Sequence, residues 1–260
     1  MDLIHGLSGL LVGLLVGLTG VGGGSLMAPI MILLLGVAPT TAVGTDLWFA
    51  AITKTVGGVV HQSLGEPDWQ VVRRLAIGSL PASILTSLAL AHLGVAHEKQ
   101  GLIVDALGVL LIATALAWLS WSRVQRTVLG LSPAATARYR RWQPALTILS
   151  GAVLGVMVTL TSVGAGALGA VMLFALYPLR MTARRLVGTD IVHAVPLTIV
   201  AGIGHLLMGN VDFALLGSLL VGSIPGIIVG SWLATRLPGH IMRPILAGVL
   251  AIVGFRMLAG

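Results

Sequence analysis

Long apolar segments follow one another along this chain of 260 residues, and they constrain its fold more than any other feature. Glycine, proline and charged residues separate ten such segments: 4–18, 25–36, 43–64, 70–92, 100–121, 145–160, 165–178, 187–208, 213–235 and 241–259. A membrane-spanning helix needs about 20 predominantly apolar residues, and six of the segments approach or exceed that length. We therefore predict an all-α integral membrane protein built as a bundle of about ten apolar segments.

Charged residues are too scarce to form the surface of a soluble protein. Lys, Arg, Asp and Glu make up 9% of the chain, against about 25% in ordinary soluble domains. The chain has no cysteine, which excludes disulfides, thiolate metal sites and a cysteine-based sulfur relay. We expect no cofactor and no bound metal.

Two pairs of segments are shorter than a full crossing: 4–18 with 25–36, and 145–160 with 165–178. Stretches of 12 to 16 apolar residues are more naturally half-membrane or re-entrant helices than complete spans. The sequence leaves open whether each pair crosses the membrane or dips in and returns, since either choice conserves the parity of the later segments.

Basic residues predict how the chain is oriented. A loop at 122–144 carries five arginines, and the positive-inside rule assigns such short basic loops to the cytoplasm. Counting segments from this loop puts twelve of the 15 Lys and Arg on the cytoplasmic side, with both termini outside. This distribution explains the net charge of +7 by membrane orientation, so we expect no binding to nucleic acid.

An internal repeat divides the chain. The triplet at 44–46, Gly-Thr-Asp, recurs at 188–190, an offset of 144 residues, and the same offset relates several further residues. They are Gly58, His61, Gly65 and Asp68, which recur as Gly202, His205, Gly209 and Asp212. We expect a first copy at 1–121 and a second at 145–260, separated by the cytoplasmic loop at 122–144. Each copy has an odd number of crossings, so the second is inverted, as in many secondary transporters.

A glycine-rich stretch lies in the first copy, from Thr19 to Ser25, and an offset of 142 residues aligns it with 161–167. Several glycines in a row break a helix, and a break within hydrocarbon is tolerated only inside protein or beside water. The helix that follows directs free N–H groups and its positive dipole end at that place, which favours an anion. The alternative is that these glycines only allow close helix packing. The candidate substrate-binding residues are Thr19, Gly22, Gly23, Gly24, Ser25, Thr161, Ser162, Gly164, Gly166 and Lys54.

Ionisable residues inside apolar segments are the other candidates. Asp46 and Asp190 lie near segment starts, where a carboxylate is suited to an N-cap; the alternative is a role in proton coupling or gating. Lys54 lies in mid-segment, where it attracts an anionic substrate or neutralises a carboxylate from the other copy.

Three histidines are further coupling or gating candidates, because histidine titrates near neutral pH. His61 and His205 are repeat-equivalent and lie near segment ends, where a purely structural role is also common. His193 lies deeper in its segment, with Pro196 following it.

The glycine-rich block at 19–26, Pro29, the Val-Gly-Thr-Asp sequence at 43–46 and their weaker second copy resemble the TauE/SafE family, also called sulfite exporters. This resemblance spans nearly the whole chain. It implies secondary transport of small sulfur-containing anions, such as sulfite, sulfoacetate or other organosulfonates, across a bacterial inner membrane. The second copy departs from the family pattern, with Ser162, Ala165 and Ala167 where the first has Gly20, Gly23 and Ser25.

Taken together, these features predict a transporter of small anions that works by alternating access, with the lipid bilayer around it and protons as a candidate coupling ion. An anion channel without coupling and a subunit that only supports a partner stay open as alternatives. A third is an intramembrane hydrolase that uses Asp46 with Asp190, or Ser25 with His61. The sequence does not fix the oligomeric state, and a homodimer is one option.

Overall fold

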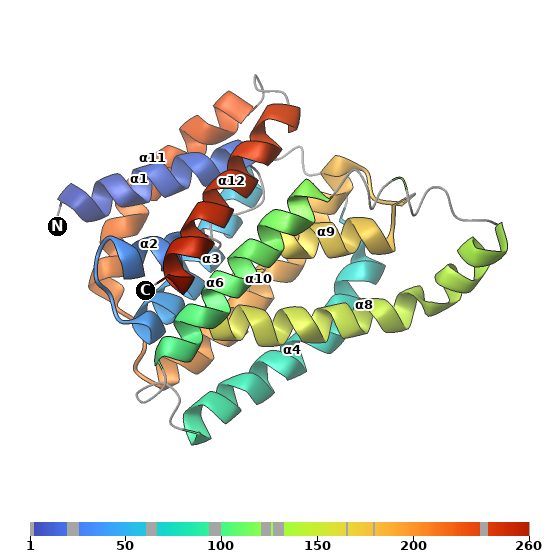
Figure 1. Cartoon of the computed structure of the whole chain (residues 1–260), viewed down its shortest axis with the longest axis horizontal. Helices are drawn as coiled ribbons and strands as arrows, with labels where there is room; N and C mark the ends of the chain where they lie inside the picture. The colour runs from blue at the N-terminus through green and yellow to red at the C-terminus, as the bar shows by residue number, and fades with distance from the viewer. Residues whose placement is uncertain are drawn as a thin grey trace.

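The computed structural model describes residues 3–19, 26–60, 67–93, 100–120, 126, 133–164, 166–178, 180–234 and 239–259. These residues form ten α-helices and no strand (Figure 1). The helices of the first copy are α1 (Leu3–Thr19), α2 (Met27–Leu33), α3 (Pro39–Val60), α4 (Trp69–His92) and α6 (Gln100–Leu119). Those of the second copy are α8 (Pro133–Thr161), α9 (Ala167–Leu176), α10 (Ala183–Leu207), α11 (Phe213–Ala234) and α12 (Gly239–Leu258).

Each of the ten predicted apolar segments corresponds to one helix, which confirms the all-α fold. The largest difference is at α8, which begins at Pro133 and so includes residues 133–144 of the predicted basic loop. Proline is favoured in the first turn of a helix, where its missing N–H has no partner to lose. The arginines that follow Pro133 end the apolar segment and do not prevent the helix.

The expectation of short segments holds for α2 and α9, which have 7 and 10 residues. It is wrong for α8, which has 29 residues and contains a candidate membrane span at Tyr139–Thr161. Four other described helices, α4, α6, α10 and α11, are also long and apolar enough to cross a membrane. Each half therefore has a short helix that cannot cross the bilayer.

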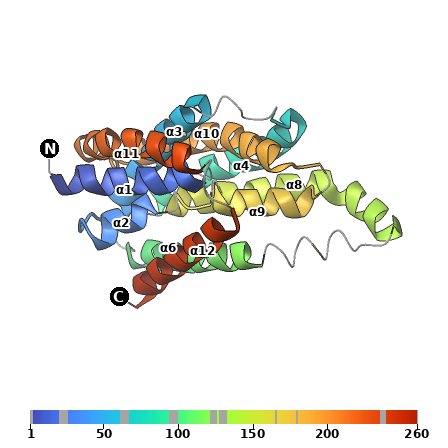
Figure 2. The same ribbon diagram turned by 90° about the horizontal axis from the view of Figure 1, so that it is seen from above.

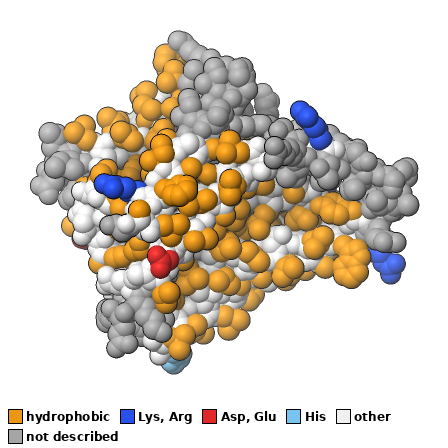
Figure 3. Space-filling view, viewed as in Figure 1, with side chains coloured by type: hydrophobic (Ala, Val, Ile, Leu, Met, Phe, Trp, Pro, Cys, Tyr) orange, Lys and Arg blue, Asp and Glu red, His pale blue; other side chains and the backbone are white. Residues whose placement is uncertain are grey.

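Apolar side chains cover much of the visible surface, and charged ones are sparse among the described residues (Figure 3). Large residues on the outward faces of the long helices, such as Leu85, Val109, Leu149 and Val221, are more than half exposed. A soluble protein of this size does not present such a surface to water. Lipid is the solvent that suits it, and the chain is a multi-pass membrane protein.

The helices pack in an interleaved way, in which equivalent helices make equivalent contacts. The first helix of one copy packs along the fourth helix of the other, α1 on α11 and α8 on α4 (Figures 1 and 2). Two further pairs join equivalent helices to each other, α3 with α10 and α6 with α12. In both views α1 and α8 run in opposite directions.

Glycines allow the α1–α11 and α4–α8 pairs to approach closely. A Cβ atom at Gly222 would collide with the backbone of Gly6, and one at the equivalent Gly78 would collide with the backbone of Ile148. Small residues at helix contacts are the usual means of packing within a membrane, where helices gain little from the hydrophobic effect. The interleaving of the two copies therefore depends on matched glycines.

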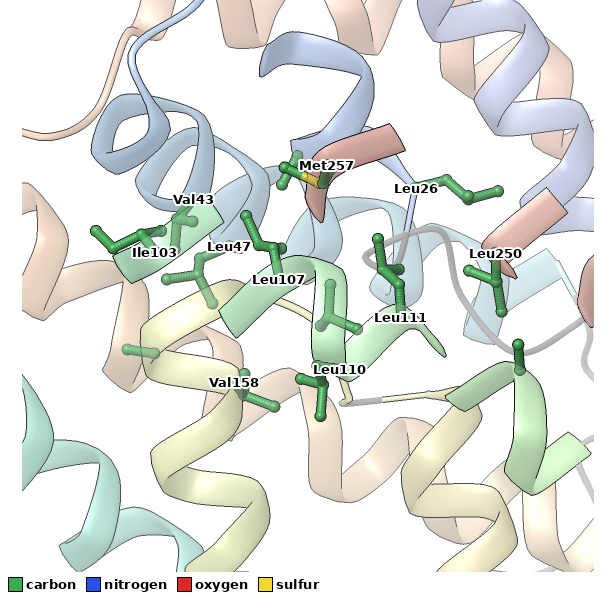
Figure 4. Close-up of a cluster of buried hydrophobic side chains, with 14 of the residues drawn as sticks. Leu26, Val43, Leu47, Ile103, Leu107, Leu110, Leu111, Val158, Leu250 and Met257 are labelled. Atoms are coloured by element: carbon green, nitrogen blue, oxygen red, sulfur yellow. The ribbon is translucent and has the colours of Figure 1, made fainter. Parts of the chain in front are cut away.

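A cluster of buried apolar side chains lies between these pairs (Figure 4). Leu107 and Leu111 of α6, Leu47 of α3 and Val158 of α8 are fully buried in it, and Met257 of α12 joins them. This cluster includes residues of α3 and α10, the two helices that carry the buried Asp46, Lys54 and Asp190.

Candidate functional site

A buried ion pair joins α3 and α10 in the interior. Lys54 Nζ of α3 lies 3.2 Å from Asp190 Oδ2 of α10, and the two residues are only 3% and 4% exposed. The sequence offered two interpretations of Lys54, and the structure has the second, neutralisation of a carboxylate from the other copy. A buried carboxylate requires such a partner, because an unpaired charge removed from water is strongly destabilising.

Asp46, the repeat-equivalent of Asp190, has different surroundings. It is 0% exposed, and neither of its carboxylate oxygens has a hydrogen-bond partner among the described residues. The Ser162 hydroxyl and the Ala28 N–H lie near the carboxylate, but outside hydrogen-bonding geometry. Two equivalent aspartates thus occupy one apolar interior, and a described cation pairs with only one of them.

The N-cap interpretation of these aspartates is wrong, because both helices begin earlier. Asp46 lies inside α3, which starts at Pro39, and Asp190 lies inside α10, which starts at Ala183. The N-cap of α10 is Thr182, whose hydroxyl accepts a hydrogen bond from Arg185 N at 3.3 Å. Both carboxylates are therefore buried inside the protein and lie beyond the first turn of their helices.

The predicted break in the second copy is present between α8 and α9. Ser162 has a φ of 58° and Gly164 a φ of 117°, both in the left-handed region. A non-glycine residue there is uncommon and indicates local strain. Gly166 is the N-cap residue of α9 and makes no side-chain hydrogen bond to cap the helix, and a Cβ atom at Gly169 would lie 2.8 Å from Asp190 Oδ1. The first turn of α9 therefore lies beside the ion pair.

The two hydroxyls predicted at this break differ in how they are bonded. Thr161 Oγ1 donates to Met157 O at 2.7 Å and accepts from Val163 N at 3.2 Å, so it stabilises the turn itself. The Ser162 hydroxyl is 1% exposed and has no partner among the described residues. Ser162 is the hydroxyl with unused hydrogen-bonding capacity at this break.

The equivalent break of the first copy lies outside the described residues, as do the predicted site residues Gly22, Gly23, Gly24, Ser25 and His61. Thr19 is the last residue of α1. Met27, eight residues later, is the first residue of α2.

The two described histidine candidates are buried and hydrogen-bonded. His193 Nε2 lies 2.8 Å from Ser79 Oγ of α4. His205 Nε2 lies 2.9 Å from the carbonyl oxygen of Thr159 in α8. Because a carbonyl only accepts, Nε2 of His205 carries the proton. These bonds connect α10 to its neighbours, which supports the structural interpretation of His205.

Two further contacts connect the copies, and the sequence did not single out the threonines that make them. The Asp68 N–H donates to Thr189 Oγ1 at 2.9 Å, and the equivalent Asp212 N–H donates to Thr45 Oγ1 at 3.1 Å. Each threonine is the middle residue of a Gly-Thr-Asp triplet. The repeat could have drawn attention to these four residues, because they recur at one offset. The offset alone does not identify which residues are in contact.

Arginines surround only one of these contacts. Arg180 donates from its Nη2 to Asp68 Oδ1 at 2.8 Å, and Arg185 Nη2 lies 3.5 Å from Asp68 Oδ2. Arg74 of α4 donates to Tyr177 Oη nearby, at 3.2 Å. The structure thus gathers three arginines of the predicted cytoplasmic side at one end of the molecule.

Comparison with known proteins identifies the family of this chain. The Sulfite exporter TauE/SafE family matches residues 6–257. The chain belongs to the TauE/SafE family. A TauE/SafE relative, probable membrane transporter protein YjnA of Bacillus subtilis (strain 168), is 41% identical over 218 residues, which cover 80% of this chain and 81% of the relative.

A second relative, probable membrane transporter protein YunE of Bacillus subtilis (strain 168), is 40% identical over 68 residues, or 26% of this chain and 25% of the relative. No solved structure matches the chain. The assignment of this chain to the TauE/SafE family therefore rests on sequence similarity. The geometry of the candidate site rests on the contacts described above.

The aspartyl hydrolase alternative requires two carboxylates that share a proton, as in aspartic proteases. Asp190 Oδ2 instead bonds Lys54, and no described group, Asp190 included, is hydrogen-bonded to Asp46. The described residues therefore do not form a dyad. The other hydrolase pair, Ser25 with His61, lies outside the described residues.

Proposed function

We propose that this chain is a secondary transporter of small anions, most specifically of sulfur oxyanions or organosulfonates such as sulfite and sulfoacetate. Membership of the TauE/SafE family supports transport and the substrate class. The name of the 41% identical relative, a probable membrane transporter, supports transport as well.

The observation that carries this proposal is the set of paired contacts between the copies around a buried charged centre. The Thr189 contact to Asp68 and the Thr45 contact to Asp212 are equivalent, and the Lys54–Asp190 pair lies in the interior. We infer two inverted repeats, 1–121 and 145–260, whose interleaved helices move in mixed groups, because the most extensive helix contacts join one repeat to the other. Alternating access requires such a pair of interfaces, one of which opens while the other closes.

The anion site that we propose is at the two helix breaks. In the second copy it comprises the first N–H groups of α9, from its N-cap residue Gly166, together with the Ser162 hydroxyl. Lys54 neutralises Asp190, which would otherwise repel the anion. Support comes from the uncapped start of α9 and the unpartnered Ser162 hydroxyl. In the first copy the equivalent residues are Thr19 and Gly22 to Ser25. A helix N-terminus binds anions through free N–H groups and its dipole.

We place the transporter in a bacterial cell membrane with its basic loops in the cytoplasm and both termini outside. The gathering of Arg74, Arg180 and Arg185 at one end supports this orientation, since loops with one sign of charge are expected on one side.

Flux through proteoliposomes tests the proposal. The purified chain should accumulate labelled sulfite or sulfoacetate, whereas Lys54→Ala and Gly23→Leu should each reduce the flux per molecule of folded protein. Gly217→Leu is the control, because a Cβ atom at Gly217 meets no atom within 4 Å. Unchanged flux in both site variants would refute the site, and uptake that never exceeds equilibrium would favour the channel. Absence of flux from the purified chain alone would favour a supporting subunit.

A further inference from the structure

The two equivalent aspartates of the interior differ in their charge partners. Asp190 lies 3.2 Å from Lys54 Nζ. The residue equivalent to Lys54 in the second copy is Thr198, whose hydroxyl donates to Ala194 O of its own helix at 2.9 Å. Asp46 therefore lacks, among the described residues, the cation that its equivalent has.

Few titratable groups lie on the elements that pack against α3. Helices α2 and α11 carry none. On α6 there is Asp105, which is exposed. On α10, Asp190 is paired with Lys54. His193 is hydrogen-bonded to Ser79, and His205 is hydrogen-bonded to Thr159. At the start of α10, Arg185 pairs with Asp68, and Arg184 is the residue before it. His61 and Glu66, after α3, lie outside the described residues.

An ionised Asp46 would be a buried negative charge without a cation beside it among the described residues. The nearby Ser162 hydroxyl and Ala28 N–H are outside hydrogen-bonding geometry with its carboxylate oxygens. Removing a lone carboxylate from water costs so much that the group takes up a proton instead. A protonated carboxyl group has an O–H to donate, and the buried, unpartnered Ser162 hydroxyl is nearby to accept it. The geometry therefore suits the acid form of Asp46.

Ser162 also belongs to the helix break at which we place the anion, so the two sites share a residue. An ionised Asp46 beside that break would repel the anion, and a protonated one would not. Binding of a proton and binding of the anion must then favour each other, because coupling between two sites is reciprocal.

We propose that Asp46 binds and releases a proton in each transport cycle and that the protein is a proton–anion symporter, in which proton and anion move in the same direction. Asp190 keeps its charge, neutralised by Lys54. This inference rests on the proposed function, because it assigns the coupling ion of the same transporter.

A pH gradient across proteoliposomes tests the coupling. With the outside more acidic than the lumen, the wild type should accumulate labelled sulfite or sulfoacetate. Asp46→Asn, which mimics the protonated form permanently, should lower that accumulation by about tenfold and keep the exchange of labelled for unlabelled anion across the membrane. Asp105→Asn, which removes an exposed carboxylate, is the matched control and should behave like the wild type.

Accumulation by Asp46→Asn at the wild-type level would overturn the assignment of Asp46, and wild-type uptake that ignores the pH gradient would overturn the symport. By contrast, a wild type that carries neither anion would contradict the proposed function itself.

Proton uptake by the wild type provides a measurement that does not depend on folding of a variant. Sulfoacetate keeps its own charge between about pH 6 and pH 8, since its carboxyl group titrates well below that range. Its addition to the detergent-solubilised protein in dilute buffer should therefore remove protons from solution, and less sulfoacetate should bind as the pH rises. Binding with no proton uptake would overturn the proposal even if Asp46→Asn does not fold.

Discussion

Two equivalent contacts join the copies, and they differ in the charges around them. Asp68 is 2% exposed, accepts from Val71 N at the start of α4 and pairs with Arg180 and Arg185. Asp212 is exposed and accepts from Leu215 N at the start of α11. At the positions equivalent to the two arginines, the first copy has Gly36 and Thr41. Both copies therefore have the hydrogen bond from the aspartate N–H to a threonine, whereas the ion pairs with arginine are made by Asp68 and not by Asp212 among the described residues.

The largest loss of stability should come from disrupting the glycine contacts that the two copies have in common. Gly78→Leu and Gly222→Leu each force a side chain into the backbone of a partner helix, so each should destabilise the protein by about 3 kcal/mol or more, or prevent folding. Unfolding of the detergent-solubilised variants measures this. Gly217→Leu, in open space on α11, should unfold like the wild type; equal losses in all three would contradict the interleaved packing.

The next largest loss of stability should differ between the Asp68 contact and the equivalent Asp212 contact. Asp68→Ala removes both an N-cap and two partly exposed ion pairs, and should cost about 2 kcal/mol. Asp212→Ala removes only the cap and should cost about 1 kcal/mol. Unfolding at low and high salt provides the control, since only the Asp68 variant should lose part of its deficit in high salt. Equal deficits in both variants would mean that the arginines add nothing.

A smaller difference should follow from the threonines. Thr189→Val leaves the buried Asp68 N–H without its acceptor and should cost about 1 to 2 kcal/mol. Thr45→Val leaves the N–H of the exposed Asp212, which water can reach, and should cost about 0.5 to 1 kcal/mol. Thermal unfolding of the two variants measures the order, and the reverse order would contradict the difference in burial.

The smallest effect should be on how often the protein opens locally at the Asp68 contact and at the Asp212 contact. The chain has no cysteine, so single reporters need no background removal. Leu186→Cys and Ala42→Cys are equivalent buried positions, near the arginine-rich end and the opposite end. Adding Arg185→Gln should raise thiol labelling of the Leu186→Cys reporter about twofold, as expected for loss of roughly 0.5 kcal/mol from a partly exposed ion pair.

Labelling of the Ala42→Cys reporter is the matched control for Arg185→Gln and should not rise. A rise at both reporters would indicate general loosening of the fold and would contradict an effect confined to the arginine-rich end.

The helices could be predicted from the sequence because spanning length and apolar composition are local properties. The start of α8 was missed because the arginines after Pro133 interrupt the apolar pattern, although they are good helix formers. The aspartates were taken for N-caps for a related reason, since α3 and α10 begin in less apolar sequence before Asp46 and Asp190.

The interior was only partly predictable. The sequence indicated that Lys54 needs a partner outside its own helix, either an anionic substrate or a carboxylate from the other copy, since Asp46 on its own helix is out of reach. The choice of Asp190 depends on how α3 packs against α10, 136 residues apart in sequence. The pairing of Thr45 with Asp212 likewise depends on packing, because the repeat identifies equivalent residues and carries no information on contacts.

The pairing of α1 with α11 has a consequence for biosynthesis. Nearly two hundred residues separate the end of α1 at Thr19 from the start of α11 at Phe213. At about 5 to 20 residues per second, the ribosome takes roughly 10 to 40 s to make that stretch. During this time the glycine-containing face of α1 can contact only lipid or the membrane-insertion machinery, because α11 has not yet been made. A nascent chain interrupted before Phe213 therefore lacks the surface that completes its first helix, which makes such truncated products natural targets for membrane quality control.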